Sequence, residues 1–392
     1  MRVGLLCNMN NILFALTRYL RDRGLDATLL LLDDEGAHFH PSADTFDLSF
    51  QAFTRRAAFG DPLGIAKVSK ASIRDAVKDF DALVGCGSAP AFLDKIGRKL
   101  DVFVPYGSDL FELPFHLQGF RRRAPLSTLE LPYRQRRGIR NAKVILGDRS
   151  LAYDEATQRL AYGGSRAFVS LPMVYTPLYS PEALPRYYGR SQWYAELAKV
   201  RESCDVMVFH HARHIWGTEF GFWQSKRNDK LIRGFAAAAR KRPDVRYALV
   251  MLEYGPEVER SKRLVAELGI ADRVTWLPQT QRKEVMIGLS LADIGCGEFA
   301  NSWLSCGTIY ETLAMAKPLL HVRDDALYRD YFPELYPLMN VARDEDIEAH
   351  LVDYVDRTAH WKAVGEAGRQ WHDRFAVREP VEAVLRYLGT RA

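Results

Sequence analysis

The stretch "RVGLLCNMNNILFALTRYLRDRGLDATLLLL", residues 2–32, decides how the first half of the chain folds. It begins with a short apolar run (2–7) that is typical of a buried strand, and residues 12–24 then repeat apolar side chains at the spacing of one helical face. Gly24 can end this helix, and a second apolar run follows at 26–32. A strand, a helix and another strand in this order predict a βαβ unit with parallel strands.

Short apolar runs alternate with segments of helical spacing in both halves of the chain. Strands that lead into loops of small residues build a doubly wound parallel sheet, which binds ligands at the carboxyl ends of its strands. We therefore predict the α/β class, with two Rossmann-like doubly wound domains. The predicted strands are 2–7, 26–32, 81–87, 101–107 and 142–148 in the first half, and 205–211, 246–252, 273–278, 292–297 and 317–322 in the second.

Chain length and one segment rich in Pro and Tyr set the predicted domain boundaries. With 392 residues, of which 47% are hydrophobic, the chain exceeds one compact core. The segment "LPMVYTPLYSPEALP" (171–185) suits an extended connection between domains. We predict domains over 1–178 and 205–375, a linker over 179–204 between them, and a final helix over 376–392.

Composition is that of an ordinary soluble globular protein. No run of about 18 uncharged apolar residues occurs, and the apolar run near the N-terminus is too short for a signal sequence, so we expect a cytoplasmic protein. The five cysteines lie far apart and form no C-x-x-C pair, which argues against a disulfide framework and against a zinc site. A net charge of +5 does not indicate a nucleic-acid partner.

Neither half carries the glycine-rich loop of dinucleotide-binding proteins. "CNMNN" (7–11) and "HHARH" (210–214) follow the first strand of each half, where G-x-G-x-x-G would stand, and a P-loop is missing from the sequence as well. A nicotinamide dehydrogenase is therefore not favoured. The second half must hold its ligand by other means.

Two cations of the second half stand where an anionic ligand would bind. Arg213 directly follows the strand 205–211, at its ligand-facing end. Lys226 comes just before a predicted helix whose first turn Asn228 or Asp229 can cap. A helix start attracts anions through its free N–H groups, and a lysine there adds a full charge. The alternative is a solvated lysine before an ordinary helix.

A third feature lies in "SCGTIYETLAMAKP" (305–318), where Ser305, Gly307 and Thr308 stand at the start of another predicted helix. Small residues at a helix start let a pyrophosphate approach the backbone N–H groups closely. Glu311, one turn further, can accept both hydroxyls of a ribose or, alternatively, only stabilise the helix start. Together with the two cations, these residues predict a nucleotide-diphosphate site.

This pattern resembles the donor domain of GT-B glycosyltransferases, in particular the retaining group with two Rossmann-like domains (glycosyltransferase family 4-like, or group 1). The resemblance implies that Arg213 and Lys226 hold the donor diphosphate. It also implies that the nucleotide base lies against the backbone of "ELGIADRVTWLP" (267–278), which ends in Leu277 and Pro278. In that group the two domains face each other across a cleft, and the last helix crosses back to the first domain.

One departure concerns the pair of glutamates that the group spaces eight residues apart. Trp303 stands eight residues before Glu311, where the first glutamate is expected. Glu298, in the loop after the strand 292–297, can supply the missing carboxylate if that loop folds back. The departure leaves the recognition of the sugar and the stereochemical outcome open.

The first half resembles the acceptor domain of the same group. "PYGSDL" (105–110) is similar to its H-G-S-D loop, with Tyr106 where a histidine often stands. Asp109 can orient or deprotonate an acceptor hydroxyl, with Ser108 beside it, or merely cap the following helix. Asn8 and Asn10 follow the first strand, where they contribute to the acceptor side or form a polar turn.

A basic stretch runs from 115 to 140 and contains Arg121 to Arg123 and Arg134 to Arg140. Arginines mixed with aromatic side chains suit a peripheral membrane surface or a surface for an anionic acceptor. A solvated basic face is the alternative interpretation.

We therefore predict a cytoplasmic, metal-independent glycosyltransferase of the hexosyltransferase type, which moves a sugar from a nucleotide diphosphate sugar to an acceptor hydroxyl. The acceptor would be a glycan or a lipid-linked glycan of envelope polysaccharide synthesis, and no separate cofactor is implied. The catalytic candidates are Asp109, Arg213, Lys226 and Glu298. Two alternatives are a non-hydrolysing nucleotide-sugar epimerase and an inactive nucleotide-sugar-binding protein.

Overall fold

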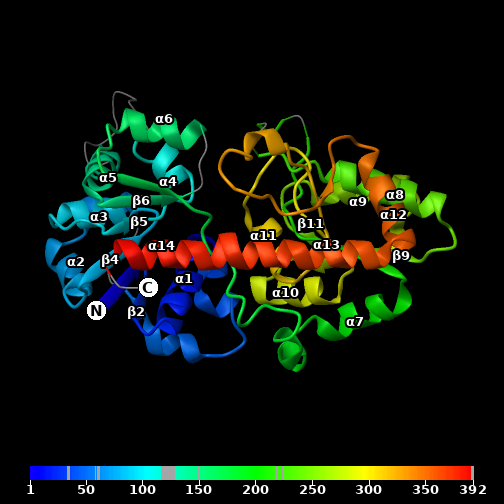
Figure 1. Ribbon diagram of the computed structural model, residues 1–392, viewed down its shortest axis with the longest axis horizontal. Coiled ribbons are helices and arrows are strands. Elements are labelled where there is room, and N and C mark those ends of the chain that lie inside the picture. Colours follow the sequence, from blue (N-terminus) through cyan, green and yellow to red (C-terminus); the bar gives the residue numbers. More distant parts are fainter. Residues whose placement is uncertain are drawn as a thin grey trace. The chain divides into compact units, whose positions relative to one another are not determined.

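The structure is a computed structural model, shown in Figure 1. It describes residues 1–32, 36–57, 59, 62–115, 129–147, 151–217, 219–221 and 224–389, without the side chains of residues 62, 63 and 151. Internal packing divides the chain into two compact units. Unit 1 consists of Met1–Tyr175 and Phe375–Ala392, and unit 2 consists of Thr176–Arg374.

Unit 1 is built on a parallel sheet with the strand order β3-β2-β1-β4-β5-β6-β7. The predicted βαβ opening is confirmed, with a helix that ends just before Gly24, a residue in the left-handed region (φ 79°). The strands are β1 (Arg2–Leu6), β2 (Asp26–Leu31), β3 (Thr54–Arg56), β4 (Ala82–Gly85), β5 (Val102–Phe103), β6 (Val144–Gly147) and β7 (Ser165–Phe168). The helices are α1 (Ile12–Asp22), α2 (Lys70–Val77), α3 (Ala89–Lys95), α4 (Ser108–Phe111), α5 (Glu130–Asn141), α6 (Leu151–Arg159) and α14 (Glu379–Tyr387).

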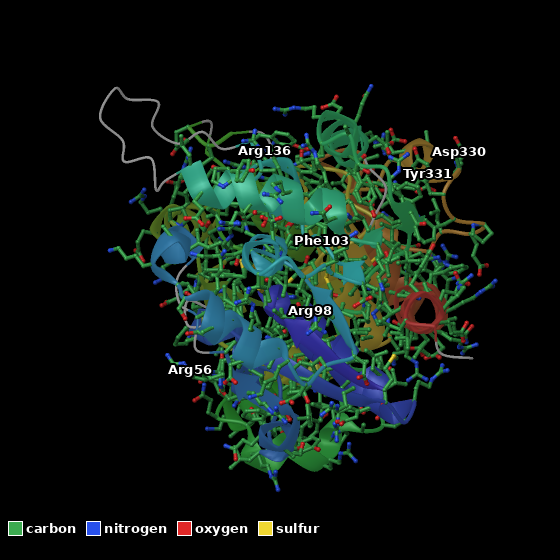
Figure 2. The ribbon with its side chains drawn as sticks, turned by 90° about the vertical axis from the view of Figure 1, so that its left-hand side faces the viewer. Arg56, Arg98, Phe103, Arg136, Asp330 and Tyr331 are labelled. Atoms are coloured by element: carbon green, nitrogen blue, oxygen red, sulfur yellow. The ribbon has the colours of Figure 1, made fainter. Side chains whose placement is uncertain are left out.

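The core of unit 1 lies between this sheet and its helices. Phe103 of β5 is fully buried there, and Figure 2 shows it among the neighbouring side chains. Arg98, also labelled in Figure 2, donates to the carbonyl oxygens of Val77 (2.6 Å) and Phe80. A cation at the last carbonyls of a helix is favourable, so Arg98 stabilises the end of α2.

The last helix, α14, contributes to the same core. Its residues Val381, Val384 and Leu385 are buried in the hydrophobic cluster of unit 1, and α14 packs against α1 (Figure 1). The apolar face of α14 thereby joins residues 375–392 to unit 1, although they follow unit 2 in the sequence.

Unit 2 contains a second parallel sheet, with the strand order β10-β9-β8-β11-β12-β13. The strands are β8 (Val206–His210), β9 (Tyr247–Glu253), β10 (Val274–Pro278), β11 (Ile294–Cys296), β12 (Leu319–His321) and β13 (Met339–Asn340). The helices are α7 (Tyr194–Ser203), α8 (Asn228–Lys241), α9 (Val258–Glu267), α10 (Arg282–Leu291), α11 (Gly307–Ala314), α12 (Asp346–Asp356) and α13 (Thr358–Trp371).

Close packing holds α10 against the sheet and α8 against α12. Gly288 in α10 lies so close to Phe209 of β8 that any side chain there would overlap the phenyl ring. Gly234 of α8 meets Ile347 of α12 in the same manner. The starts of α8 and α10 are thus held at the carboxyl edge of the sheet, where the ends of parallel strands meet.

Both sheets reverse their strand order beside their first strand. β1 pairs with β2 on one side and β4 on the other, and β8 pairs with β9 and β11. Loops that leave such neighbouring strands in opposite directions open a crevice at the carboxyl edge, which is the usual ligand position in doubly wound sheets. The predicted α/β class with two Rossmann-like sheets is confirmed.

All five cysteines are free thiols, four of them buried. Among the helices that the structure describes, none has the length and apolar character needed to span a membrane.

Candidate functional site

Lys226 lies directly before α8, at the carboxyl edge of the unit 2 sheet. The expectation that Asn228 or Asp229 caps this helix is wrong, because Arg227 is at the cap position with left-handed backbone angles (φ 52°, ψ 45°). The Asn228 side chain instead contacts His210 Nε2 (2.8 Å) and accepts from the Ile215 N–H (3.1 Å). These bonds link the end of β8 to the start of α8.

The Lys226 ammonium pairs with Glu298, which follows β11. Nζ lies 2.6 Å from Oε1, and the two side chains are only 14% and 9% exposed. The backbone holds the same two segments together, since the Phe299 N–H donates to the Lys226 carbonyl (3.0 Å). The second carboxylate oxygen of Glu298, Oε2, is buried without a hydrogen-bond partner in the described part of the chain.

His321, at the end of β12, fixes the loop that carries Glu298. Its Nδ1 lies 2.7 Å from the Glu298 carbonyl oxygen and 3.0 Å from the Glu298 nitrogen, and its Nε2 lies 3.0 Å from the Trp303 carbonyl oxygen. Burial lowers the pKa of His321 to about 4. The imidazole therefore acts as a neutral brace between the two ends of loop 298–303.

Glu311, a residue of α11, forms a charged cluster with Arg282 and His211. Arg282 Nε lies 2.6 Å from its Oε1, and His211 Nε2 lies 2.7 Å from its Oε2. Burial alone would raise the pKa of Glu311, but the charge of Arg282 and the contact with His211 outweigh it and lower the pKa to about 2. Glu311 is therefore ionised, and its Oε1 lies 3.7 Å from the place that a Cβ would take at Gly307.

The start of α11 lies beside the Lys226–Glu298 pair. Cys306 is the cap residue, and Gly307 and Thr308 begin the helix, whose first N–H groups have no partner within it. Burial raises the pKa of the Cys306 thiol to about 12, the charge of Glu298 adds to the rise, and the charge of Lys226 opposes it. Both charges thus lie near the helix start, and Ser305, just before it, is half-buried.

Other predicted residues of this half are more loosely connected to this group. Arg213 is exposed in the loop after β8 and makes no hydrogen bond or ion pair with the described residues, although its neighbour His211 contacts Glu311. Leu277 is buried near the end of β10, and Pro278 is exposed at its last position. The geometry therefore brings Lys226, Glu298, Glu311 and the start of α11 together.

Sequence reasoning missed Arg282, the strongest partner of Glu311. It begins α10, where an arginine has no pattern that separates it from a solvated cation. His321 was missed too, since a single histidine at a strand end is a weak signal. Of the pair His210 and His211, only His211 reaches a predicted site residue.

At the carboxyl edge of the unit 1 sheet, Asp109 is buried and bound by the backbone. The N–H groups of Gly87 (2.8 Å), Tyr106 (3.0 Å) and Gly107 (3.0 Å) donate to its two carboxylate oxygens. Burial raises the pKa of Asp109 to about 7, although these N–H groups lower it. The carboxyl group fastens the loops that follow β4 and β5 to each other. Ser108, next to it, is exposed.

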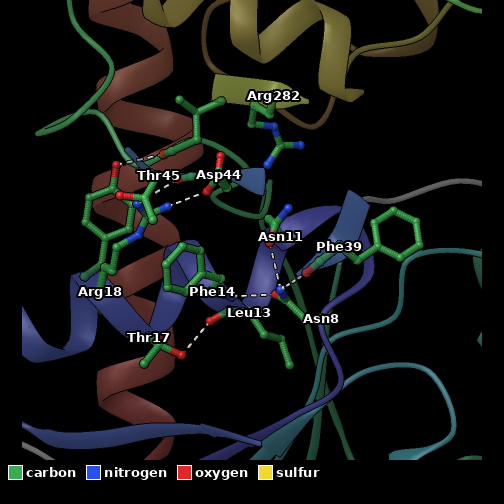
Figure 3. A network of polar contacts seen from close by, with 12 residues as sticks. Asn8, Asn11, Leu13, Phe14, Thr17, Arg18, Phe39, Asp44, Thr45 and Arg282 are labelled. Carbon is green, nitrogen blue, oxygen red and sulfur yellow. Dashed lines mark hydrogen bonds and ion pairs between the residues drawn. The ribbon is translucent and has the colours of Figure 1, made fainter. Parts of the chain in front are cut away.

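The residues that follow β1 form a polar network, shown in Figure 3. Asn8 is fully buried; its amide donates to Asn11 Oδ1 (2.8 Å) and the Phe39 carbonyl (2.5 Å), and its Oδ1 accepts from the Phe14 N–H (2.8 Å). Asn8 thus anchors the start of α1. Asn10 is exposed, in the left-handed region (φ 52°).

Tyr106 lies near the ends of β1 and β4. Its ring approaches Gly87, the residue that also lies near the Cys7 thiol. Burial raises the pKa of its hydroxyl, and the charge of Asp109 adds to the rise. The phenol is therefore protonated at neutral pH.

Part of the predicted basic stretch, Arg121 to Arg123, lies outside the described residues. In α5, Arg134 pairs with Glu130 (2.6 Å) and Asp94 (3.2 Å), and Arg140 donates to the Leu160 carbonyl (2.6 Å). Arg136, labelled in Figure 2, lies on the same helix. Arg134 and Arg140 thus have partners within unit 1. Among the described side chains, no group of three or more His, Cys, Asp or Glu is placed to hold a metal ion.

Neither a family model nor a curated protein matches this chain. Solved structures do match over nearly its whole length. Anabaena HepE in complex with UDP-glucose is 16% identical, covers 99% of both chains and has a TM-score of 0.61. The chain has the GT-B fold. Other GT-B structures agree: a sucrose-phosphate synthase from Thermosynechococcus elongatus (14% identity, 99% and 98% coverage, TM-score 0.59) and WaaG, a glycosyltransferase involved in lipopolysaccharide biosynthesis (13%, 97% and 98%, 0.57). The GT-B fold predicted from the sequence is confirmed.

Proposed function

We propose that this protein is a glycosyltransferase that moves a sugar from a nucleotide diphosphate sugar to an acceptor hydroxyl. The observation that carries the proposal is the group at the edge of the unit 2 sheet. A largely buried lysine lies near the N-terminus of α11, and an ionised, buried glutamate lies one turn into this helix. A helix N-terminus is a common setting for phosphate binding. The GT-B fold supports it, since one protein with this fold was solved with UDP-glucose.

In this proposal the donor diphosphate lies against the start of α11. As the bond between the anomeric carbon and the diphosphate oxygen breaks, negative charge collects on the leaving group. Lys226, Arg213 and the N–H groups of Gly307 and Thr308 then stabilise that charge. We expect these groups to suffice without a metal ion. Glu311, ionised and held by Arg282 and His211, keeps lone pairs free for the hydroxyls of the ribose.

The backbone near Leu277 and Pro278 is the proposed position of the nucleotide base. In unit 1, the acceptor-side candidates are Tyr106, Ser108 and Asp109. A pKa of about 7 suits a group that takes up the acceptor proton near neutrality, and the three N–H donors hold Asp109 in position.

Asn10 belongs to the same acceptor side. Asn8 is buried and holds the backbone of this loop through its hydrogen bonds at the start of α1. We further propose a retaining enzyme of envelope polysaccharide synthesis, located in the cytoplasm and peripheral to the membrane, with a glycan or lipid-linked glycan as acceptor.

Thermal unfolding with a panel of UDP-glucose, ADP-glucose and GDP-mannose tests the proposal, together with release of nucleoside diphosphate from each. A ligand at 100 times its dissociation constant should stabilise the protein by about 2.7 kcal/mol. We expect one donor to raise the melting temperature and to be hydrolysed slowly. A panel without any shift and without any release would contradict the proposal.

An epimerase is the second candidate, because a UDP-GlcNAc 2-epimerase from Methanocaldococcus jannaschii has a similar fold (11% identity, 99% of both chains, TM-score 0.52). His211, which contacts Glu311, offers an imidazole for the proton transfers of such chemistry. Proton NMR of the nucleotide sugar separates the two candidates: an epimerase yields a second sugar isomer without an acceptor, whereas a transferase yields free nucleoside diphosphate. An inactive binding protein would yield neither.

A further inference from the structure

The ammonium group that the proposed function assigns to the diphosphate already has a counter-ion. Lys226 Nζ lies 2.6 Å from Glu298 Oε1, and both side chains are largely withdrawn from solvent. An incoming diphosphate and the Glu298 carboxylate are both anions, so they compete for the same cation. A donor can use the full charge of Lys226 only if Glu298 gives up this contact.

The second carboxylate oxygen of Glu298 indicates that a hydrogen-bond donor is missing. Oε2 is buried and has no partner, whereas buried carboxylate oxygens in folded proteins usually accept hydrogen bonds. An ionised carboxylate only accepts, so the group that fits here must donate. Sugar hydroxyls are neutral donors of this kind.

The loop of Glu298 is fixed, so that its carboxylate stays close to Lys226. His321 holds the Glu298 backbone and the Trp303 carbonyl, and a side chain at Gly297 would overlap the His321 ring. The Val322 N–H also donates to the Glu298 carbonyl (3.2 Å). Because His321 and Val322 hold its backbone, Glu298 can change partner by rotating its side chain but cannot leave the site.

We propose that Glu298 is a placeholder and a specificity-determining residue of the donor site. In the free protein it neutralises Lys226. When the diphosphate takes over Lys226, the Glu298 carboxylate accepts hydrogen bonds from hydroxyl groups of the donor's sugar. This inference rests on the proposed function. It makes the site selective for a hydroxylated nucleotide sugar over the bare nucleoside diphosphate, which is also the product that must leave.

Isothermal titration of UDP and UDP-glucose into the parent and Glu298→Gln tests this inference; GDP and GDP-mannose replace them if the panel shows a preference for guanine. Glutamine keeps the shape of the side chain and removes its charge. We expect the variant to bind the nucleoside diphosphate severalfold more tightly, because Lys226 no longer has a competing anion. The preference for the sugar-bearing ligand should fall by roughly tenfold, the usual worth of a hydrogen bond to a charged group.

Glu253→Gln is a matched control, since Glu253 pairs with Lys262 (2.8 Å) in the same unit. It should leave both affinities unchanged. Deoxy analogues of the donor sugar provide a second measurement, whose first part uses the parent protein alone. At least one should bind the parent roughly tenfold more weakly than the full sugar, and this loss should vanish in Glu298→Gln.

Two results are distinguishable from each other. If the parent binds nucleotide sugars while Glu298→Gln leaves both affinities and the deoxy pattern unchanged, Glu298 is only a structural ion-pair partner and the inference is wrong. If the parent binds neither nucleotides nor nucleotide sugars, the proposed function fails, and the inference fails with it.

Discussion

Two buried carboxylates, Glu311 at the edge of the unit 2 sheet and Asp109 at the edge of the unit 1 sheet, have pKa values on opposite sides of their usual range. Burial acts in the same direction on both. The charge of Arg282, with the contact from His211, holds Glu311 ionised with a pKa of about 2, whereas neutral N–H groups leave Asp109 at about 7. One sheet topology thus supports a permanently charged site and a site whose carboxyl group titrates near neutrality.

The two edges also differ in how much of their polar surface is already used. In unit 1, the carboxylate of Asp109 and the amide of Asn8 already bond to backbone and side-chain groups of neighbouring segments. In unit 2, Glu298 Oε2 is buried without a partner and Arg213 has no partner among the described residues. This difference supports the assignment of the donor to unit 2.

The largest expected effect is that of Lys226→Ala on turnover. The Lys226 charge interacts more strongly with the leaving group as that group becomes negative. Its loss should therefore reduce transition-state stabilisation by roughly 2–4 kcal/mol, which lowers kcat/KM about 30- to 1,000-fold. Steady-state kinetics with the donor identified by the panel measure this. Lys230→Ala is the control, because Lys230 lies one turn further along α8 and pairs with Asp344 (2.8 Å). Equal losses in both variants would show that the effect is not specific to Lys226.

Glu311→Gln should change how the free energy of unfolding depends on pH. The pKa of Glu311 falls from 4.5 to about 2 on folding. Its contribution to the free energy of unfolding is therefore complete above pH 4.5 and disappears as the pH falls toward 2. This contribution is worth about 3 kcal/mol. Urea unfolding of parent and variant at pH 7, 4.5 and 3 should show a difference in unfolding free energy that shrinks with acidification. A difference independent of pH would show that the Arg282 charge does not act on Glu311 as described.

Asp109→Asn should give the opposite pH dependence. An amide offers one acceptor oxygen instead of two, so at least one buried N–H loses its partner, at a cost of about 1–3 kcal/mol. The pKa of Asp109 is raised on folding, so its contribution is complete below pH 3.8 and declines as the pH rises toward 7. The difference between parent and variant should therefore narrow from pH 4 to pH 7. A difference that widens over this range would refute the raised pKa.

Arg213→Lys should have the smallest effect. Lysine keeps the charge but not the planar fork that binds phosphate through two parallel bonds, so donor affinity should drop by about fivefold. Titration of the donor into parent and variant measures the drop. Because Arg213 is exposed and unpaired among the described residues, the melting temperature should not change. An unchanged affinity would place Arg213 outside the donor site.

The sequence predicted the central strands and the edge strand β10, but not the edge strands β3, β7 and β13. Buried strands such as β1 and β8 are continuous apolar runs, a signal that burial on both faces imposes. The edge strand β3 (Thr54–Arg56) is short and polar, and β13 has two residues, so neither has a pattern to find.

The same limit applies to the candidate site. Lys226 and Glu311 stand at helix starts, where local sequence indicates anion binding, and the structure places both beside the start of α11. Their ion-pair partners, Glu298 and Arg282, come from distant segments. Their contacts depend on how β11 and α10 pack in the sheet, and no local pattern carries that information.

Calorimetric titration of the panel's preferred nucleotide sugar into the parent and into the double variant Arg213→Ala, Lys226→Ala tests the central claim most directly: that the edge of the unit 2 sheet binds the donor diphosphate. Two lost charge-assisted contacts should weaken binding by roughly 100-fold or more. The free double variant should also unfold at a lower temperature, because Glu298 loses its counter-ion, so the titration is made well below that temperature. Parental affinity in the double variant would contradict the claim, because a diphosphate bound at this edge cannot be indifferent to both cations.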